Sequence, residues 1–214
     1  MKLSLSREFF VTFFVAVACL TLFWVIDTPG LFESFLAAFF FFLVVPFFYI
    51  RIVLRRPVSF LSFPLHFPYR NSVLSFGLAS LVCVFLLVVA FSYWSSFSQE
   101  YFVPGFLFDR FWLFLLYEFF VVFPLLFLYE FFFRGFLLFS FESALGVWSI
   151  VVQFAFLFFF FLFSDNSLLS VLPIILAAPF AGVIAYLSRC VFYSSFFVFL
   201  VVFFTDVFMI RFLS

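Results

Sequence analysis

Long, uninterrupted apolar runs are the feature of this sequence that most restricts its fold. A membrane-spanning helix needs about 20 mainly apolar residues, and runs of Phe, Leu and Val reach that length repeatedly. Of 214 residues, 69% are hydrophobic and 9% are charged, more apolar surface than a soluble domain of this size can bury. The runs lack the period-two alternation of a transmembrane β-barrel. The sequence therefore predicts an all-α, polytopic integral membrane protein.

The apolar runs predict about seven membrane-spanning helices, which form one transmembrane domain over residues 1–214. The spans are expected at 8–26, 31–50, 72–94, 110–128, 146–163, 168–187 and 192–211. Residues 129–142 either continue the fourth span or form a separate short helix, which would give eight. A cleaved signal peptide is not expected, because the first run continues through Ile26 without an Ala-x-Ala-like exit. The 51 Phe residues are interpreted as packing groups.

The positions of Lys and Arg test this layout, because short cytoplasmic loops carry the positive excess. With the N-terminus inside, eight of the ten basic residues fall on the cytoplasmic side: Lys2, Arg7, Arg51, Arg55, Arg56, Arg70, Arg134 and Arg189. Arg110 and Arg211 fall on the opposite side. We therefore expect a multi-pass protein with a cytoplasmic N-terminus, in a prokaryotic inner membrane. The basic segment 51–71 is expected to lie on anionic lipid rather than to bind nucleic acid.

One acid and one base, Glu130 and Arg134, stand four residues apart in an otherwise apolar stretch, Leu128-Tyr129-Glu130-Phe131-Phe132-Phe133-Arg134-Gly135. On a helix this spacing places both side chains on one face. Ionisable residues at membrane depth are costly enough to be treated as functional candidates. The structural alternative is an ion pair near the interface, in which Arg134 extends its charge toward the headgroups.

This stretch resembles the Glu-Glu-x-x-x-Arg motif of the CPBP family, the CAAX-prenyl-protease and bacteriocin-processing intramembrane endopeptidases. The resemblance covers residues 110–210 and includes Gln153 and the helix around Gly182. It implies a CPBP-like helical bundle whose members hydrolyse peptide bonds. Glu130 matches the second glutamate of the motif and Arg134 the arginine.

The chain departs from the family pattern at three positions. Tyr129 replaces the first glutamate, to which the family assigns the activation of water. The family's two motif histidines would fall at Phe161 and Val202, and neither side chain can shuttle a proton or bind a metal. Asp206 stands where the last motif has Asn or Asp. The remaining histidine, His66, lies in the basic segment and would reach the site only by an unusual fold-back.

Three functions follow from these residues. The first is a catalytically degenerate CPBP-like protein that binds membrane-embedded or prenylated polypeptides, with Glu130, Arg134 and Asp206 as its site residues. The second is an active intramembrane endopeptidase that uses Glu130 with Asp206 or Glu118. The third is an unrelated small transporter or membrane assembly factor. Whether the protein is an enzyme stays open at this point.

The sequence says less about the remaining polar residues and the cysteines. Glu142 is expected to be a solvated acid at a loop or helix end, and Asp206 could alternatively pair with Arg211. No cofactor or metal is expected, since the three cysteines show no disulfide or metal-ligand spacing; they are Cys19, Cys83 and Cys190.

Overall fold

The computed structural model describes residues 7–26, 30–55, 70–94, 96–101, 104, 111–164 and 167–213, and within these ranges all regular structure is helical. Most of the basic segment, with Arg56 and His66, lies outside the described residues. So do Lys2 and Arg110. The expectations that concern these residues therefore remain predictions.

The described residues form sixteen helical elements along the chain. They are α1 (Arg7–Val25), α2 (Leu31–Ala38), η1 (Phe39–Val44), α3 (Val45–Phe48), η2 (Tyr49–Val53), α4 (Arg70–Trp94), α5 (Phe97–Glu100), α6 (Phe111–Tyr117), η5 (Glu118–Val122), α7 (Phe123–Glu130), η6 (Phe131–Leu138), α8 (Phe139–Leu145), η7 (Gly146–Trp148), α9 (Ser149–Leu162), α10 (Leu172–Ser188) and α11 (Val191–Leu213). Helices α2 to η2 run on without a break, as do α6 to α8. Residues 129–142 therefore continue the helix before them.

Within the described residues, five helical stretches are long and apolar enough to cross a membrane. They are Arg7–Val25, Phe32–Val53, Arg70–Tyr93, Phe111–Leu162 and Val191–Arg211. The predicted spans 110–128 and 146–163 both lie inside the 52-residue stretch Phe111–Leu162, and the predicted span 168–187 corresponds to the shorter apolar helix α10. The all-α, polytopic fold that the sequence predicts is confirmed at this level.

Gly146 divides the 52-residue stretch in two. Its φ of 58° and ψ of −130° are accessible to glycine and strongly disfavoured for other residues. The chain turns back at this residue, so that α9 packs along η6 rather than extending α8. The glycine thus converts one long apolar stretch into a helical hairpin.

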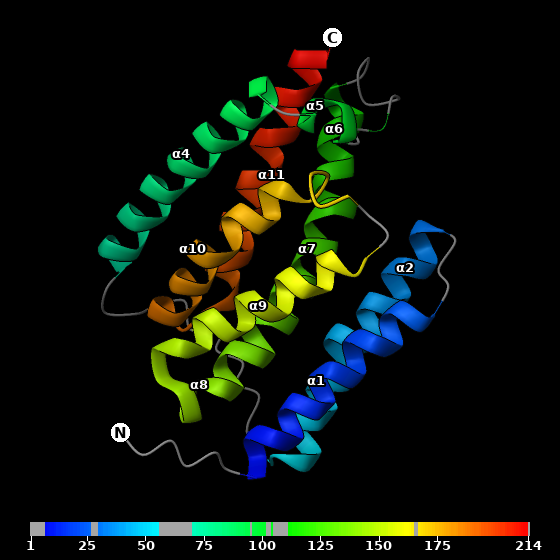
Figure 1. The fold of residues 1–214 in the computed structure, drawn as a ribbon, viewed down its shortest axis with the longest axis vertical. Coiled ribbons are helices and arrows are strands. Elements are labelled where there is room, and N and C mark those ends of the chain that lie inside the picture. Colours follow the sequence, from blue (N-terminus) through cyan, green and yellow to red (C-terminus); the bar gives the residue numbers. More distant parts are fainter. Residues whose placement is uncertain are drawn as a thin grey trace.

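The helices alternate in direction and form an elongated bundle (Figure 1). At one end, Phe9 packs against Phe141 with ring centroids 4.9 Å apart. At the other end, the Ser167 hydroxyl donates a hydrogen bond to the Glu100 carboxylate. We call these the α8 end and the α5 end. Arg7 begins α1 and Arg189 pairs with Glu142 of α8, so both lie at the α8 end. Arg51 and Arg55 lie in and just after η2, and Arg70 begins α4.

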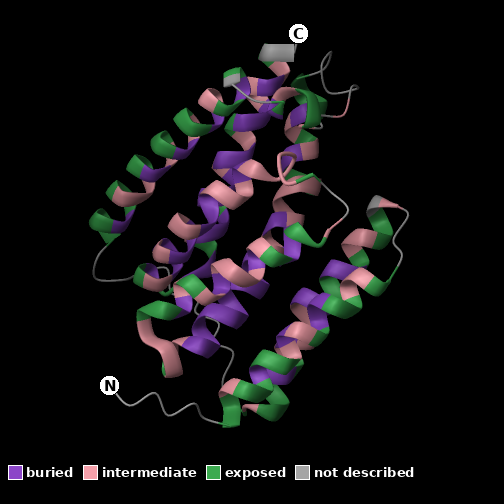
Figure 2. Cartoon of the chain, in the orientation of Figure 1, coloured by how far each residue is buried: buried purple, intermediate pink, exposed green. Residues whose placement is uncertain are grey.

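Burial in this bundle is typical of a protein surrounded by lipid. Large apolar side chains on the outside are strongly exposed, including Phe120 at 75% and Trp112 at 76%. Figure 2 shows the buried residues concentrated on η6, α9, α10 and α11, whereas the outer faces of α1 and α4 are exposed. Because these exposed faces are apolar, their contact with water would be unfavourable. The described helices therefore fit an integral membrane protein.

Wide turns interrupt several of the helices. In these turns a backbone N–H bonds to the carbonyl five residues earlier, as Phe123 does to Glu118 and Val45 to Phe40. Such π-type turns are rare, and they occur frequently at functional sites. One wide segment, η6, begins directly after Glu130 and contains Arg134.

Candidate functional site

Glu130 and Arg134 form an ion pair in the interior of the bundle. Arg134 Nη1 lies 2.5 Å from Glu130 Oε1, and the two side chains are 0% and 1% exposed. The prediction that Glu130 and Arg134 lie on one face of a helix is confirmed. The i,i+4 ion pair of the structural alternative is also present, but Arg134 does not extend its charge out of the bundle, because its guanidinium is fully buried. Arg134 is instead the largest fully buried side chain among the described residues.

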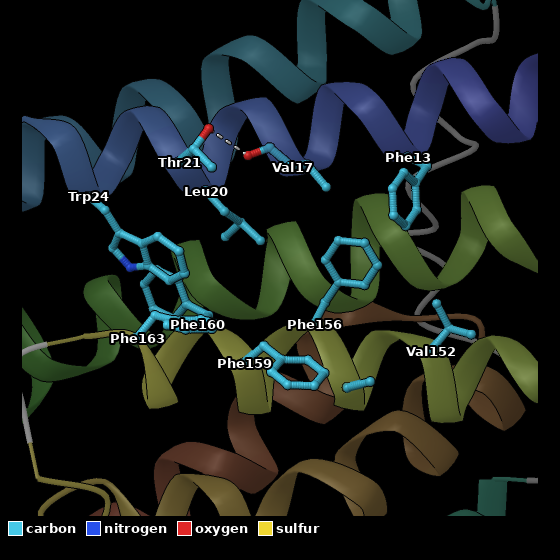
Figure 3. A pocket seen from close by; sticks show the side chains of 11 residues that line it. Phe13, Val17, Leu20, Thr21, Trp24, Val152, Phe156, Phe159, Phe160 and Phe163 are labelled. Atoms are coloured by element: carbon cyan, nitrogen blue, oxygen red, sulfur yellow. Dashed lines mark hydrogen bonds between the residues drawn. The ribbon is translucent and has the colours of Figure 1, made fainter.

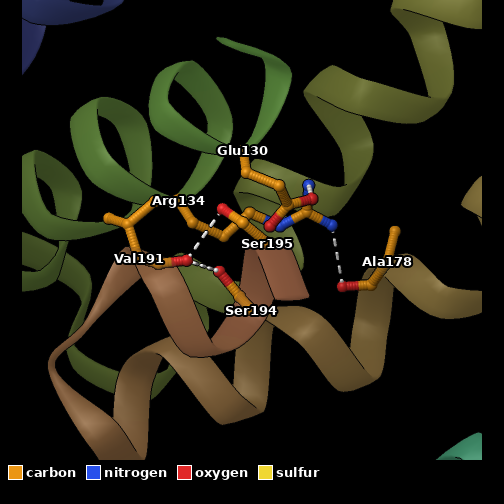
Figure 4. A network of polar contacts seen from close by, with 6 residues as sticks. All are labelled: Glu130, Arg134, Ala178, Val191, Ser194 and Ser195. Atoms are coloured by element: carbon orange, nitrogen blue, oxygen red, sulfur yellow. Dashed lines mark hydrogen bonds and ion pairs between the residues drawn. The ribbon is translucent and has the colours of Figure 1, made fainter. Parts of the chain in front are cut away.

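Two other helices hold this ion pair in place (Figure 4). Arg134 Nη2 donates a 3.2 Å hydrogen bond to the Ala178 carbonyl on α10. The hydroxyl of Ser194, on α11, is within hydrogen-bonding reach of the Glu130 carboxylate. Ser194 and Ser195 each donate to the Val191 carbonyl at 2.9 Å. The pair therefore links η6 to α10 and α11, so it connects three elements of the bundle.

Several buried polar atoms near this pair have unused hydrogen-bonding capacity. Within the described part of the chain, Glu130 Oε2, Arg134 Nε and both amide atoms of Gln153 have no hydrogen-bond partner. A buried polar group without a partner is costly, and in a native structure it calls for an explanation. Atoms of this kind are available to a peptide group or another polar ligand.

Gly182 and Gln153, which the sequence resemblance singled out separately, meet in the structure. A Cβ atom at Gly182 would lie 2.6 Å from Gln153 Nε2 and 3.0 Å from Ile150 Cγ2. The absence of a side chain at Gly182 therefore lets Gln153 approach the backbone of α10. Gly182 lies four residues after Ala178, so Gln153 and Arg134 reach α10 on adjacent turns.

Aromatic rings occupy the positions at which the family motif has its first glutamate and first histidine. The ring centroids of Tyr129 and Phe161 are 6.1 Å apart, and Tyr129 also packs against Phe160 at 5.7 Å and Phe42 at 5.4 Å. The structure thus brings residues 129 and 161 together, a contact that the sequence did not predict. The groups brought together are rings that supply neither a carboxylate nor an imidazole.

Asp206 does not join Glu130. It lies on α11 twelve residues beyond Ser194, about 18 Å along the helix. Tyr101 Oη donates a 2.5 Å hydrogen bond to Asp206 Oδ1, and the carboxyl group of Glu118 is in hydrogen-bonding contact with Asp206. The candidate residues thus form two separate groups, and the expected combinations of Glu130 with Asp206 or Glu118 are not formed.

The sequence offered no signal for Tyr101. It follows α5 in a segment without a recognisable motif, and Asp206 lies 105 residues further along the chain. Burial, and then the neighbouring Asp206 carboxylate, raises the pKa of the Tyr101 phenol well above its ordinary value. Tyr101 therefore remains a hydrogen-bond donor at physiological pH.

Glu142 differs from the solvated acid that the sequence suggested. Its carboxylate forms an ion pair with Arg189, and the two side chains are 16% and 51% exposed. Arg189 ends α10 with a positive φ of 55°, which turns the chain into α11. This pair closes the α8 end of the bundle and lies apart from the buried pair.

An apolar groove lies between α1 and α9 (Figure 3). Its volume is about 400 Å³, and its walls include Phe13, Leu20, Trp24, Phe156 and Phe159. The Thr21 hydroxyl in the groove wall bonds to the Val17 carbonyl of its own helix at 2.9 Å. Within the described residues, Trp24 Nε1 has no hydrogen-bond partner. The groove therefore has apolar walls, and the Nε1–H of Trp24 in its wall is buried and without a partner.

No group of three or more His, Cys, Asp or Glu side chains with metal-binding geometry occurs among the described residues. Cys19 and Cys190 are buried and Cys83 is exposed, all three as free thiols. In comparisons with known proteins, no family model, no curated protein and no solved structure matches this chain.

Proposed function

We propose that this protein is a CPBP-like membrane protein that binds membrane-embedded or prenylated polypeptides without hydrolysing them. The observation that carries the proposal is the pairing of Tyr129 with Phe161, 6.1 Å apart, at the positions where the family has its water-activating groups. A CPBP-like arrangement would bring these two positions together. Neither Tyr129 nor Phe161 supplies the carboxylate or the imidazole that the family has at these positions.

Peptide hydrolysis requires a general base, a proton donor and stabilisation of the oxyanion. Glu130 is the one carboxylate beside this aromatic cluster, and the Arg134 guanidinium holds one of its oxygens at 2.5 Å. Arg134 thereby occupies Oε1, one of the two oxygens through which Glu130 could act as a base. We therefore assign Glu130 and Arg134 to the scaffold of the binding protein, where they link η6 to α10 and α11.

The proposed protein crosses the membrane seven times. The stretch Phe111–Leu162 would supply two crossings because it turns back at Gly146, and the shorter helix α10 would supply another. The N-terminus would lie in the cytoplasm, with the α8 end and its basic residues on the same side of a prokaryotic inner membrane. The α1–α9 groove would then open laterally toward the bilayer.

The α1–α9 groove is the proposed binding site for the lipidated or apolar part of the polypeptide. Its volume of about 400 Å³ lies within the range of small-ligand sites, which also combine apolar walls with few polar groups. The Trp24 Nε1–H is buried and has no hydrogen-bond partner among the described residues, so a rotation of the ring would let it donate to a backbone carbonyl of the bound chain. A prenylated peptide supplies both an apolar chain and such a carbonyl.

Cleavage assays on purified protein in lipid test the absence of hydrolysis. We expect no cleavage of a panel of membrane-tethered and prenylated peptides by the wild type, by Glu130→Ala or by the control Glu142→Ala. Each variant is compared at matched folding, judged by its thermal transition. Cleavage that Glu130→Ala abolishes and Glu142→Ala preserves would show an active endopeptidase and contradict the proposal.

Binding to the groove is tested with a fluorescent prenylated peptide and protein in nanodiscs. Ala155→Trp fills the α1–α9 groove and is expected to weaken binding about tenfold or more, which corresponds to about 1.4 kcal/mol. The matched control is Leu78→Trp, which fills a second apolar groove between α4 and α11. Equal affinities for both variants, or no binding by the wild type, would refute the assignment.

A further inference from the structure

A second group of buried ionisable side chains lies near the α5 end, and the proposed binding function does not use it. Glu118 opens the wide segment η5, Asp206 lies in α11, and Tyr101 follows α5. Glu118 is 1% exposed and Asp206 is 8% exposed. Two acids that meet in the interior of a membrane protein require a compensating charge or proton.

The hydrogen bonds within this group converge on the carboxylate of Asp206. Tyr101 Oη donates to Asp206 Oδ1 at 2.5 Å, and Asp206 is also in hydrogen-bonding contact with Glu118. Within the described residues, Glu118 Oε2 has no hydrogen-bond partner although it is buried. Asp206 therefore accepts hydrogen bonds from two sides, and Glu118 keeps one free oxygen.

Two carboxyl groups in contact away from water cannot both be ionised, because their repulsion and desolvation are large. A hydrogen bond between two carboxyl groups also requires a proton on one of them. The Tyr101 hydroxyl stabilises the ionised form of Asp206, since a donor favours the charged acceptor. The proton is accordingly expected on Glu118, which donates it to Asp206.

We propose that Glu118 and Asp206 form a proton-binding site, in which two carboxyl groups of different helices hold one exchangeable proton. Asp206 is the more exposed of the two carboxyl groups, at 8% against 1% for Glu118, so proton exchange is assigned to its side of the pair. Loss of the proton places two negative charges together and drives η5 away from α11. Binding of the proton is thereby coupled to the packing of these two helices.

Among the described residues, the groups that interact electrostatically with the pair are Tyr101 and Tyr117, which carry no positive charge. Tyr117 is the neighbour of Glu118 in sequence and is neutral when protonated. Glu100, at the same end, accepts hydrogen bonds from Ser96 and Ser167. Arg211 lies five residues beyond Asp206, more than one helical turn away. Asp109 and Arg110 are outside the described residues.

Infrared spectroscopy of the full-length protein in lipid at neutral pH tests the proposal directly. The wild type is expected to show the C=O stretch of one protonated carboxyl group, which shifts on exchange into heavy water. Glu118→Gln should abolish this band, because the Gln amide can donate to Asp206 in place of the carboxyl proton. Asp206→Asn should keep the band at a shifted frequency. Glu142→Gln, at an ion pair far from the site, should leave it unchanged.

The proposal would be overturned by a wild-type spectrum without a protonated carboxyl band, or by a band that survives in Glu118→Gln. A band that disappears on addition of sodium or potassium ions at constant pH would also overturn it, in favour of a cation site. Glu118→Gln preserves volume and hydrogen bonding, and the thermal transition of each variant is measured first. Should Glu118→Gln fail to fold, the heavy-water shift and the Asp206→Asn spectrum decide the question.

Discussion

At the scale of single residues, the most unusual feature is a guanidinium enclosed by aromatic rings and helix backbone. Transfer of a charge into such an interior costs several kcal/mol, and an ion partner with good geometry offsets part of this cost. For Arg134 the partners are Glu130 at 2.5 Å and the Ala178 carbonyl at 3.2 Å. Removing one member leaves a buried charge uncompensated.

We therefore expect Arg134→Met to lower the free energy of unfolding by about 3–5 kcal/mol. The double variant Arg134→Met with Glu130→Gln should recover part of this loss, because it removes both charges. Unfolding in mixed micelles by titration with a denaturing detergent provides the measurement. If the double variant is less stable than Arg134→Met alone, the two charges do not compensate one another.

The exposed ion pair of Arg189 and Glu142 provides the matched control. Arg189→Met removes the same kind of charge at a site where the arginine is 51% exposed. Surface ion pairs contribute about 0–1 kcal/mol, so the expected loss is correspondingly small. If Arg189→Met and Arg134→Met lower the free energy of unfolding by similar amounts, burial is not the reason why Arg134 matters for stability.

At the scale of helices, small residues decide how closely the elements approach. The buried face of α10 is lined by Ala177, Ala178, Ala181, Gly182 and Ala185. Membrane helices with small residues at their contacts can pack backbone against backbone. This explains how α10 contacts α4, α9 and α11 together, and how the Ala178 carbonyl becomes available to Arg134.

Gly146 allows the chain to turn back between α8 and α9, and replacing it gives a further prediction. Gly146→Ala should destabilise the protein by about 1–3 kcal/mol, because its backbone conformation is strained for a residue with a Cβ atom. The same detergent titration measures the change. Gly77→Ala is the control, since its Cβ would make an ordinary 3.7 Å contact with Ile184 and alanine favours helix by up to about 1 kcal/mol. Equal effects at both glycines would refute this explanation.

At the scale of the whole molecule, the two ends of the bundle differ in charge. Arg7, at the start of α1, and Arg189, which pairs with Glu142, lie at the α8 end. The α5 end carries Glu100 and the carboxyl pair of Glu118 and Asp206. The orientation of the protein in the membrane follows from this asymmetry if the positive-inside rule applies.

Cysteine labelling in intact cells or sealed vesicles measures this orientation. In a background without the three native cysteines, Ser143→Cys and Gln99→Cys place exposed thiols at the α8 and α5 ends. A membrane-impermeant maleimide should label Ser143→Cys from the cytoplasmic side and Gln99→Cys from the opposite side. Reversed labelling would place the N-terminus outside, and labelling of both from one side would contradict a membrane crossing by the continuous helix α6 to α8 that separates them.

The sequence by itself determined the features that depend on local spacing. Apolar runs indicate helices because the bilayer requires internally satisfied backbone groups. The contact between Glu130 and Arg134 follows from a spacing of four residues on a helix. Helix boundaries were predicted less well at 146–163, where the chain is already turning at Gly146 and α9 begins at Ser149.

Only the tertiary structure decided which helices meet. With apolar residues on nearly every face, the sequence contains little periodicity that selects the inward side of a helix. It therefore did not reveal that Arg134 is buried, that Tyr129 packs on Phe161, or that Tyr101 and Glu118 meet Asp206 across 105 and 88 positions of the chain. These contacts depend on close packing between helices that are distant in sequence, which local spacing does not encode.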